Sequence, residues 1–270
     1  MSCAGCYDFC INASASFFEK FSLAGQVSLI TGSARGLGLV MARALAGCGG
    51  HVLVNGRNVQ AVDAAVASLR AEGLAASALP FDVSDDAASE AAFARIDAEF
   101  GRLDVLVNNV GMRRRKTLAA ATAAEIRELI EVDLVAGMLL SKRAAERMVK
   151  RKYGRLITIT SVLGEVTRSG DALYPAAKQG LTGMMRALAT EYAKDGITSN
   201  AIAPGTFVTE INEAMAADPV VGPAVGARNP MGRWGRPEEI ATAAVFLASP
   251  ASSFVNGHVL VVDGGLSVQM

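Results

Sequence analysis

The sequence of 270 residues has no excess of charge of either sign. Lys and Arg together number 26, and Asp and Glu together also number 26. A chain without a net field exerts no long-range attraction on a polyanion, and we find no basic stripe with interleaved aromatic residues. These two absences argue against the nucleic-acid-binding classes. We therefore expect no nucleic-acid partner.

Long uninterrupted apolar runs are also missing, although 51% of the residues are hydrophobic. A membrane-spanning helix needs about 18 such residues in succession. The first residues do not form the basic segment, apolar core and small-residue cleavage site of a signal peptide. We therefore expect no membrane partner and a cytoplasmic location.

Cysteine and histidine are scarce, with four and two residues in the chain. Cys3, Cys6 and Cys10 crowd the N-terminus, whereas Cys48 lies at the expected end of a helix. Tetrahedral zinc needs four ligands, and no histidine lies near enough to complete the set. We predict a poorly ordered N-terminal extension over residues 1–20, with unpaired thiols and no metal.

What the sequence does contain is a regular alternation of short apolar runs and longer amphipathic stretches. Runs that are apolar almost throughout are typical of strands covered on both faces. Strict alternation of such strands with helices predicts an α/β fold, a single-domain Rossmann-type doubly wound sheet of about seven parallel strands flanked by helices. The expected strands are 27–31, 51–55, 75–81, 103–108, 155–160, 198–203 and 258–262, and the expected helices include 37–46, 58–71, 85–100, 123–152 and 176–194.

No linker, low-complexity block or repeat interrupts this pattern, so we assign residues 21–270 to one Rossmann-fold domain. The segment 211–233 is the exception, because Ala, Pro and Gly dominate it and no strand pattern is visible. It is either a mobile lid over the site or an ordinary surface loop.

The first expected strand runs directly into a glycine-rich turn, Thr-Gly-Ser-Ala-Arg-Gly-Leu-Gly, over residues 31–38. Glycines at such a turn let the backbone approach a pyrophosphate and let the following helix pack against the strand. The N–H groups that open the helix then face the phosphates. The position of this turn in the first strand–helix unit predicts a dinucleotide site.

The spacing Thr-Gly-x-x-x-Gly-x-Gly resembles that of the short-chain dehydrogenase/reductase family, and the resemblance extends from about Leu23 to Gly265. Further motifs match in order along the chain. They are Asp82-Val83, Asn108-Asn109-Val110-Gly111 with Val in place of the usual Ala, Pro204-Gly205 with Thr209, and Val262-Asp263-Gly264-Gly265. The resemblance implies a nicotinamide-dependent oxidoreductase that acts on an alcohol or a carbonyl.

The choice of cofactor can be argued from charge. Enzymes of this fold that prefer NAD place an acidic residue after the second strand, where it binds the adenosine ribose. In this sequence Gly56 stands there, followed by Arg57, and Arg35 lies in the glycine turn. Two guanidinium groups without a carboxylate favour the extra phosphate of NADP over NAD. The expected cofactor contacts are Gly32, Ser33, Ala34, Arg35, Gly36, Leu37, Gly38, Arg57, Asp82, Val83, Asn109, Gly111, Tyr174, Lys178, Pro204, Gly205, Phe207 and Thr209.

Tyr174 and Lys178 are spaced four residues apart in a predicted helix and so share one face. A nearby ammonium favours the phenolate and lowers a pKa that is ordinarily about 10. Tyr174 can then exchange a proton with the reacting oxygen. Ser161 follows the fifth strand, where the family's substrate-orienting serine falls, so we predict that it holds that oxygen.

Asp133 stands where the family usually has an asparagine that completes a catalytic tetrad. The resemblance implies that the backbone carbonyl of this residue holds a water connecting the lysine to solvent, and a carbonyl survives the replacement. A carboxylate buried there needs a partner or a raised pKa. We predict a retuned proton relay with activity retained.

Four consecutive cations, Arg113 to Lys116, follow the fourth strand at the expected substrate entrance. They could bind a carboxylate, face solvent or form an interface patch. Arg114 stands where the gluconate 5-dehydrogenase branch of the family also has arginine. Segments 21–23, 233–239 and 254–258 resemble that branch as well, which implies a sugar-acid substrate such as gluconate or 5-ketogluconate bound through Arg114.

Two other functions remain open. A 3-oxoacyl-thioester reductase would use the basic loop to dock an acyl carrier, and a non-catalytic NADPH-binding sensor would bind the cofactor without turnover. The intact Ser161, Tyr174 and Lys178 argue against the sensor. The resemblance further implies a homotetramer or a homodimer.

Overall fold

The protein is described here by a computed structural model that covers residues 17–269. Cys3, Cys6 and Cys10 lie outside the described residues, so the predicted extension over residues 1–20 stays a prediction. The carbonyl of Lys20 accepts a hydrogen bond of 3.0 Å from the amide of Ala251. Contact with the folded domain is therefore already made at residue 20.

Seven parallel strands form one sheet, in the order β3-β2-β1-β4-β5-β6-β7. This confirms the predicted fold class. The direction of the strand order reverses between β1 and β4, and ligands of such sheets bind outside the carboxyl ends of the strands at that point. The strands are β1 (Val27–Ile30), β2 (His51–Val54), β3 (Ala76–Ala78), β4 (Val105–Asn108), β5 (Gly154–Ile159), β6 (Ile197–Pro204) and β7 (Val259–Val262).

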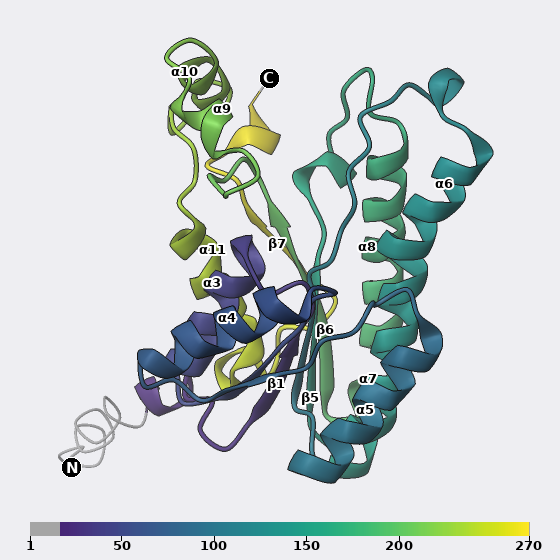
Figure 1. Ribbon diagram of the computed structural model, residues 1–270, viewed down its shortest axis with the longest axis vertical. Coiled ribbons are helices and arrows are strands. Elements are labelled where there is room, and N and C mark those ends of the chain that lie inside the picture. The colour runs from purple at the N-terminus through teal and green to yellow at the C-terminus, as the bar shows by residue number, and fades with distance from the viewer. Residues whose placement is uncertain (1–16, 270) are drawn as a thin grey trace, which may run out of the picture.

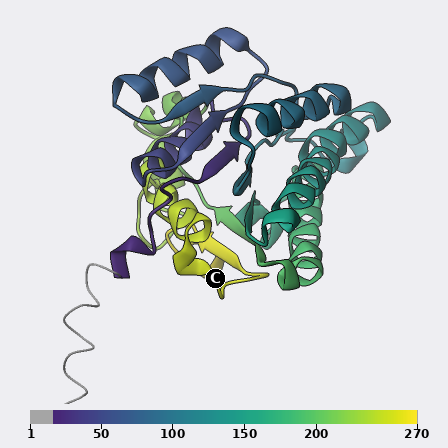
Figure 2. The same cartoon turned by 90° about the horizontal axis from the view of Figure 1, so that it is seen from below.

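Helices cover both faces of this sheet (Figures 1 and 2). Helices α3, α4 and α11 lie on one face, and α5, α7 and α8 lie on the other. The helices are α3 (Gly36–Gly47), α4 (Val59–Ala71), α5 (Asp86–Phe100), α6 (Ala123–Ile130), α7 (Ala136–Arg151), α8 (Leu173–Glu191), α9 (Glu213–Ala217), α10 (Val221–Gly226) and α11 (Pro237–Ala248), with short turns η1 (Leu118–Ala120), η2 (Glu131–Val135), η3 (Val162–Gly164), η4 (Ala193–Asp195), η5 (Pro250–Ser252) and η6 (Leu266–Val268).

Each face of the sheet has its own apolar core. Met41, Val62 and Ile240 pack on one face, from α3, α4 and α11. Phe93 and Leu140 pack on the other, from α5 and α7. The central strands β1, β4, β5 and β6 are buried at every position, which explains why their sequences are apolar almost throughout.

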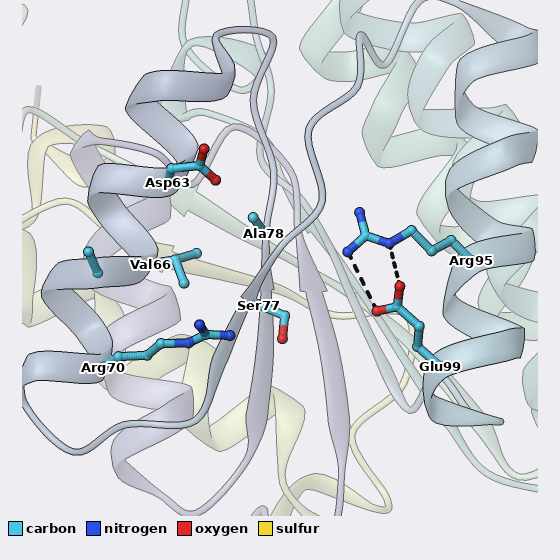
Figure 3. A pocket seen from close by; sticks show the side chains of 8 residues that line it. Asp63, Val66, Arg70, Ser77, Ala78, Arg95 and Glu99 are labelled. Carbon is cyan, nitrogen blue, oxygen red and sulfur yellow. Dashed lines mark hydrogen bonds and ion pairs between the residues drawn. The ribbon is translucent and has the colours of Figure 1, made fainter.

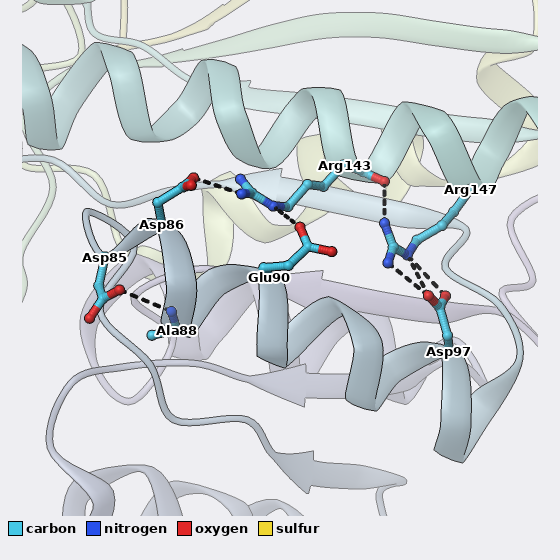
Figure 4. A network of polar contacts seen from close by, with 7 residues as sticks. All are labelled: Asp85, Asp86, Ala88, Glu90, Asp97, Arg143 and Arg147. Atoms are coloured by element: carbon cyan, nitrogen blue, oxygen red, sulfur yellow. Dashed lines mark hydrogen bonds and ion pairs between the residues drawn. The ribbon is translucent and has the colours of Figure 1, made fainter.

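Charged side chains join α5 to α7, which cover the same face of the sheet (Figure 4). Arg143 donates from Nη2 to Asp86 at 2.6 Å and from Nε to Glu90 at 2.8 Å. One turn further along α7, the guanidinium of Arg147 contacts Asp97 at 2.7 Å. Residues four apart on a helix share one face, so both arginines reach the same neighbour.

The structure differs from the expected elements in four places. The expected helix 123–152 is interrupted by the π-helical turn η2, and α8 begins at Leu173 rather than at residue 176. The segment 211–233 contains the short helices α9 and α10, so whether it is a lid stays open. Strand β3 covers only three residues of the expected 75–81.

The membrane prediction can be examined on the described helices. Between residues 17 and 269, none of them combines the length and the apolar character needed to cross a bilayer.

Candidate active site

The glycine-rich turn is held in place by backbone and amide groups of neighbouring strands. Gly32 donates its amide to the side-chain oxygen of Asn55 at 3.1 Å. The Ser33 hydroxyl donates to the carbonyl of Ile30 at 2.6 Å. A Cβ on Gly38 would lie 2.5 Å from the Gly32 carbonyl oxygen, which is closer than atoms can approach. The turn therefore tolerates glycine alone at position 38, as close packing of α3 on the loop requires.

The amino end of α3 can accept an anion. The backbone amide of Gly36 donates to a carboxylate oxygen of Glu210 at 3.4 Å, across 174 positions of sequence. Free N–H groups at a helix N-terminus attract negative charge, and here a side-chain carboxylate already contacts one. A phosphate group of a dinucleotide suits the same position.

Arg35 and Arg57 are both exposed at this end of the sheet. The Arg57 guanidinium lies 3.7 Å from the Asp82 carboxylate, and 78% of its side chain is exposed. Burial works to raise the pKa of Asp82, but hydrogen bonds from Ser84 and the charge of Arg57 hold that pKa below its ordinary value. An exposed pair of this kind is weak, so Arg57 remains available to a ligand phosphate.

Asn109 connects the end of β4 to the glycine turn. Its amide nitrogen Nδ2 donates to the Thr31 carbonyl at 2.8 Å and to the Gly32 carbonyl at 3.3 Å. Its backbone amide donates to the Thr31 hydroxyl at 2.9 Å. The strand-four motif therefore fixes the shape of the glycine turn as well as lining the same edge of the sheet.

The motif after β6 packs against the C-terminal motif. A Cβ on Gly205 would lie 2.6 Å from the Cα of Asp263, so the two chain segments touch at this point. Beyond it, Phe207 is buried, and Thr209 donates its amide to the Asn212 side chain at 2.7 Å. These segments bring Pro204, Gly205 and Thr209 to the carboxyl edge of the sheet.

Ser161 and Tyr174 meet where β5 and α8 approach one another. Ser161 caps η3 by accepting the amide of Leu163 at 3.1 Å. Burial raises the pKa of the Tyr174 phenol, while a hydrogen bond with the Ser161 side chain and the charge of Arg113 oppose that rise. The expected net lowering of the Tyr174 pKa is therefore wrong, because desolvation is the largest effect and raises that pKa.

Lys178 is fully enclosed beneath Tyr174. Its Nζ lies 5.5 Å from the centre of the Tyr174 ring, donates to the Ile159 carbonyl at 3.1 Å, and lies 3.9 Å from Oδ2 of Asp133. Burial lowers the pKa of Lys178, and the charge of Asp133 partly restores it. The predicted pair therefore lies together on one helix face.

Asp133 is a buried carboxylate with one hydrogen-bonded oxygen, because its Oδ2 accepts no hydrogen bond and has the Lys178 Nζ 3.9 Å away. Turn η2 places its Oδ1 2.5 Å from the amide of Met112, and only 2% of the residue is exposed. Burial raises the pKa of this carboxyl, whereas Lys178 and the Met112 amide lower it. Gly111 keeps this space open, because a Cβ there would lie 2.9 Å from the Nζ of Lys178.

The four consecutive cations separate into two groups. Arg113 lies over the Tyr174 ring, with its guanidinium carbon 5.2 Å from the ring centre, and donates to Asp171. Arg114 contacts Glu128 on α6 at 2.5 Å, and Lys116 contacts Glu125 at 2.6 Å. The neighbour of Tyr174 is therefore Arg113, which the sequence did not single out.

An open cleft of about 600 Å³ lies elsewhere, between α4, α5 and the edge strand β3 (Figure 3). Its lining includes Asp63, Arg70 and the ion pair of Arg95 with Glu99, at 2.6 Å. It contains none of the residues predicted for the site. The chemistry-bearing groups gather instead at the carboxyl ends of β1, β4, β5 and β6.

Three contributors to this site were absent from the predictions: Asp171, Arg113 and Glu210. Arg113 lay within the basic run but was not distinguished from its neighbours. Nothing in the local sequence signals the other two, because their partners are 58 and 174 positions away. Among residues 17–269, no group of three His, Cys, Asp or Glu side chains is arranged to hold a metal ion.

Comparison with known proteins places this site in a family. The family model described as enoyl-(acyl carrier protein) reductase matches residues 32–267. Gluconate 5-dehydrogenase of Gluconobacter oxydans is 40% identical over 252 residues, which cover 93% of this chain and 98% of that protein. The 3-oxoacyl-[acyl-carrier-protein] reductase of Escherichia coli is 38% identical over 90% of this chain and 97% of that protein.

A solved structure agrees with the sequence comparison. The gluconate 5-dehydrogenase of Burkholderia cenocepacia, in complex with NADP and tartrate, superposes with a TM-score of 0.89 at 38% identity. The match covers 94% of this chain and all of that one. The chain belongs to the short-chain dehydrogenase/reductase family.

Proposed function

We propose that this protein is an NADP-dependent oxidoreductase that interconverts an alcohol and a ketone of a sugar acid, such as gluconate and 5-ketogluconate. The observation that carries the proposal is the meeting of Ser161, Tyr174 and Lys178 at the same carboxyl edge of the sheet as the glycine turn. The similarity to gluconate 5-dehydrogenases supports the substrate class.

NADP fits the groups at the carboxyl edge of the sheet. The amide of Gly36 already contacts a carboxylate, Gly38 leaves no room for a side chain, and Arg57 is exposed after β2. We propose that the glycine turn holds the pyrophosphate and that Arg35 and Arg57 hold the adenosine 2′-phosphate. Asp82, Val83, Asn109, Gly111, Pro204, Gly205, Phe207 and Thr209 complete the proposed contacts.

When bound, the nicotinamide supplies the hydride for reduction or accepts it during oxidation. Ser161 holds the reacting oxygen by a hydrogen bond next to the phenol. In reduction, Tyr174 donates its proton to the carbonyl oxygen as the carbon gains the hydride, and in oxidation the phenolate takes the proton from the alcohol. The raised pKa of Tyr174 keeps that proton on the phenol at neutral pH.

Lys178 and Asp133 act beneath this centre. The Lys178 ammonium stabilises the phenolate that remains after proton donation, and Asp133 supports the charge on the lysine. A lysine in an enclosed site would otherwise lose its proton readily. We therefore propose that Asp133 preserves function in place of the family's asparagine.

Reduction of a 3-oxoacyl thioester is the second candidate, and the similarity to an acyl-carrier-protein reductase favours it. The two candidates differ in the charge of the substrate close to the carbonyl. A panel of 5-ketogluconate and an acetoacetyl thioester, with NADPH and with NADH, separates them by the loss of reduced-cofactor absorbance. We expect turnover of 5-ketogluconate with NADPH. Turnover of the thioester alone contradicts the proposal, and binding of NADPH without turnover of either compound indicates a sensor.

We also propose a cytoplasmic protein that assembles as a homotetramer or a homodimer. Exposed apolar side chains on α7 and β7 support self-association, with Met138 49% exposed and Val261 40% exposed. Sedimentation at several concentrations measures the state of assembly, and a monomer at every concentration contradicts it.

A further inference from the structure

Two arginines contact one buried carboxylate next to Tyr174, and the charges of these three groups act on a third arginine, Arg115. We call Arg113, Arg115 and Arg168 the arginine cluster, and the carboxylate is that of Asp171. We propose that this cluster, chiefly through Arg113, binds the carboxylate of the acid substrate, and that Arg114 does not. The inference rests on the proposed function and names the residues that would select an acid.

Asp171 fixes the position of Arg113. Its side chain is 1% exposed, and its Oδ2 accepts from Nη2 of Arg113 at 2.8 Å and from Nε at 3.3 Å. The guanidinium of Arg168 lies 3.6 Å from the same oxygen. Because Asp171 precedes Tyr174 by three residues, the carboxylate that orients Arg113 is built into the approach to α8.

The Arg113 guanidinium lies close to the reacting centre. Its guanidinium carbon lies 5.2 Å from the centre of the Tyr174 ring, and 35% of its side chain is exposed. A guanidinium has five N–H donors, and the bonds to Asp171 leave Nη1 unused. A substrate whose ketone reaches Tyr174 and Ser161 can therefore bring a carboxylate a few bonds away to Arg113.

The charge of the cluster calls for an anion. The guanidinium groups of Arg113 and Arg168 share the single carboxylate of Asp171, which balances only one of their two positive charges. Burial lowers the pKa of Arg115, the neighbouring charges of Arg113 and Arg168 lower it further, and the charge of Asp171 only partly opposes this fall. Like charges held together are destabilising, and a bound carboxylate would relieve that repulsion.

The charge of Arg114, in contrast, is balanced by neighbouring carboxylates. Its Nη2 is 2.5 Å from Glu128 and its Nη1 is 3.5 Å from Glu125, so two carboxylates of α6 neutralise it. Capture of a substrate carboxylate would require breaking these pairs. The two adjacent arginines thus differ in how far their charge is balanced. Arg113 shares one carboxylate with Arg168, whereas Arg114 contacts two carboxylates.

The experiment compares three single variants of the full chain, Arg113→Gln, Arg114→Gln and Arg127→Gln. Arg127 lies exposed on α6 and serves as the matched control for loss of one surface arginine. Each is tested with NADPH against 5-ketogluconate and against L-sorbose, an uncharged ketose of similar size. We expect KM for 5-ketogluconate to rise roughly 10- to 100-fold in Arg113→Gln, because the variant loses the charge-assisted hydrogen bond to the substrate carboxylate. KM for sorbose should change much less than KM for 5-ketogluconate, because sorbose has no carboxylate to lose.

Asp171→Asn tests positioning. It should raise KM for 5-ketogluconate with little change for sorbose, and melting curves with NADPH verify that the variant is folded. An unchanged KM in folded Arg113→Gln, with the loss appearing in Arg114→Gln instead, overturns this inference and leaves the proposed function standing. If the wild type reduces only the thioester, the proposed function fails and this inference fails with it.

Discussion

The glycine turn and the basic loop are both connections at the carboxyl edge of the sheet, yet they are held in different ways. In the glycine turn, Gly32 donates to the Asn55 side chain, Ser33 donates to the Ile30 carbonyl, and the Thr31 carbonyl accepts from the Asn109 side chain. In the basic loop, Arg113 and Arg114 are held by carboxylates from two different segments. The first region is held by uncharged hydrogen bonds between side chains and the main chain, and the second by ion pairs between side chains.

This difference indicates where substrate specificity can change. A turn fixed by backbone groups accepts few substitutions, because each alters the main-chain path on which the cofactor depends. A loop fixed by ion pairs can exchange partners while the backbone stays in place. Proteins with one cofactor site can therefore diverge in substrate.

Substitution of Gly38 should break the first region most severely. In Gly38→Ala the new Cβ meets the Gly32 carbonyl at 2.5 Å and the Asn109 amide at 2.7 Å, and overpacking of this kind costs about 1–3 kcal/mol or more. We expect NADPH affinity to fall by roughly tenfold to more than a hundredfold and the melting temperature to drop. The matched control is Gly47→Ala in the same helix, where the Cβ meets open space. NADPH binding is measured by calorimetric titration. Equal NADPH affinity of the two variants would contradict the proposal that close packing at Gly38 shapes the cofactor site.

Removal of Arg57 should alter cofactor choice without altering the fold. Because the side chain is exposed and its pair with Asp82 is long, Arg57→Ala should weaken NADPH binding about tenfold and leave NADH binding unchanged. Arg43→Ala is the control, since Arg43 pairs with Glu72 on the surface. Titrations with NADPH and with NADH measure the ratio of the two dissociation constants. An equal loss of affinity for NADH would refute the proposed contact between Arg57 and the 2′-phosphate.

Asp133 accepts a hydrogen bond from the amide of Met112, next to the basic loop, and its removal should shift the pH profile. Asp133→Asn takes away the charge that raises the pKa of Lys178 and contributes to the raised pKa of Tyr174, so both pKa values should fall. Reduction needs the phenol proton, so its decline at high pH should begin at lower pH, with turnover at neutral pH changed only a few-fold. Glu131→Gln on the same turn is the control, because Glu131 is exposed. A shift toward higher pH would contradict this reading.

Glu210 should give the smallest effect. In Glu210→Gln the carboxylate no longer competes for the Gly36 amide, so NADPH should bind about two- to fivefold more tightly. Glu213→Gln on α9 removes a nearby exposed carboxylate and should change nothing. Weaker NADPH binding in Glu210→Gln would mean that this side chain assists the cofactor.

The sequence predicts the strands well because both faces of the central sheet are buried, so apolar runs mark them directly. The glycine turn and the Tyr174–Lys178 pair were also foreseeable, since each depends on spacing within one segment. Helix α11 is not among the expected helices, although Pro237 at its first position and two acidic residues after it mark a helix start.

Turn η2 and the partners of the basic loop could not be foreseen. A π-helical turn depends on how the helix packs against its neighbours, and no local pattern marks it. Which of four successive cations faces Tyr174 depends on Asp171 and Glu128, which come from other segments. The sequence therefore supported Arg114, whereas the contacts now favour Arg113.

The most direct test of the account measures Tyr174→Phe beside the wild type, with 5-ketogluconate and NADPH. The substitution keeps the ring and removes the proton that the reacting oxygen receives. We expect turnover to fall by about a thousandfold or more while NADPH affinity stays unchanged. Turnover within tenfold of the wild type would show that another group donates the proton.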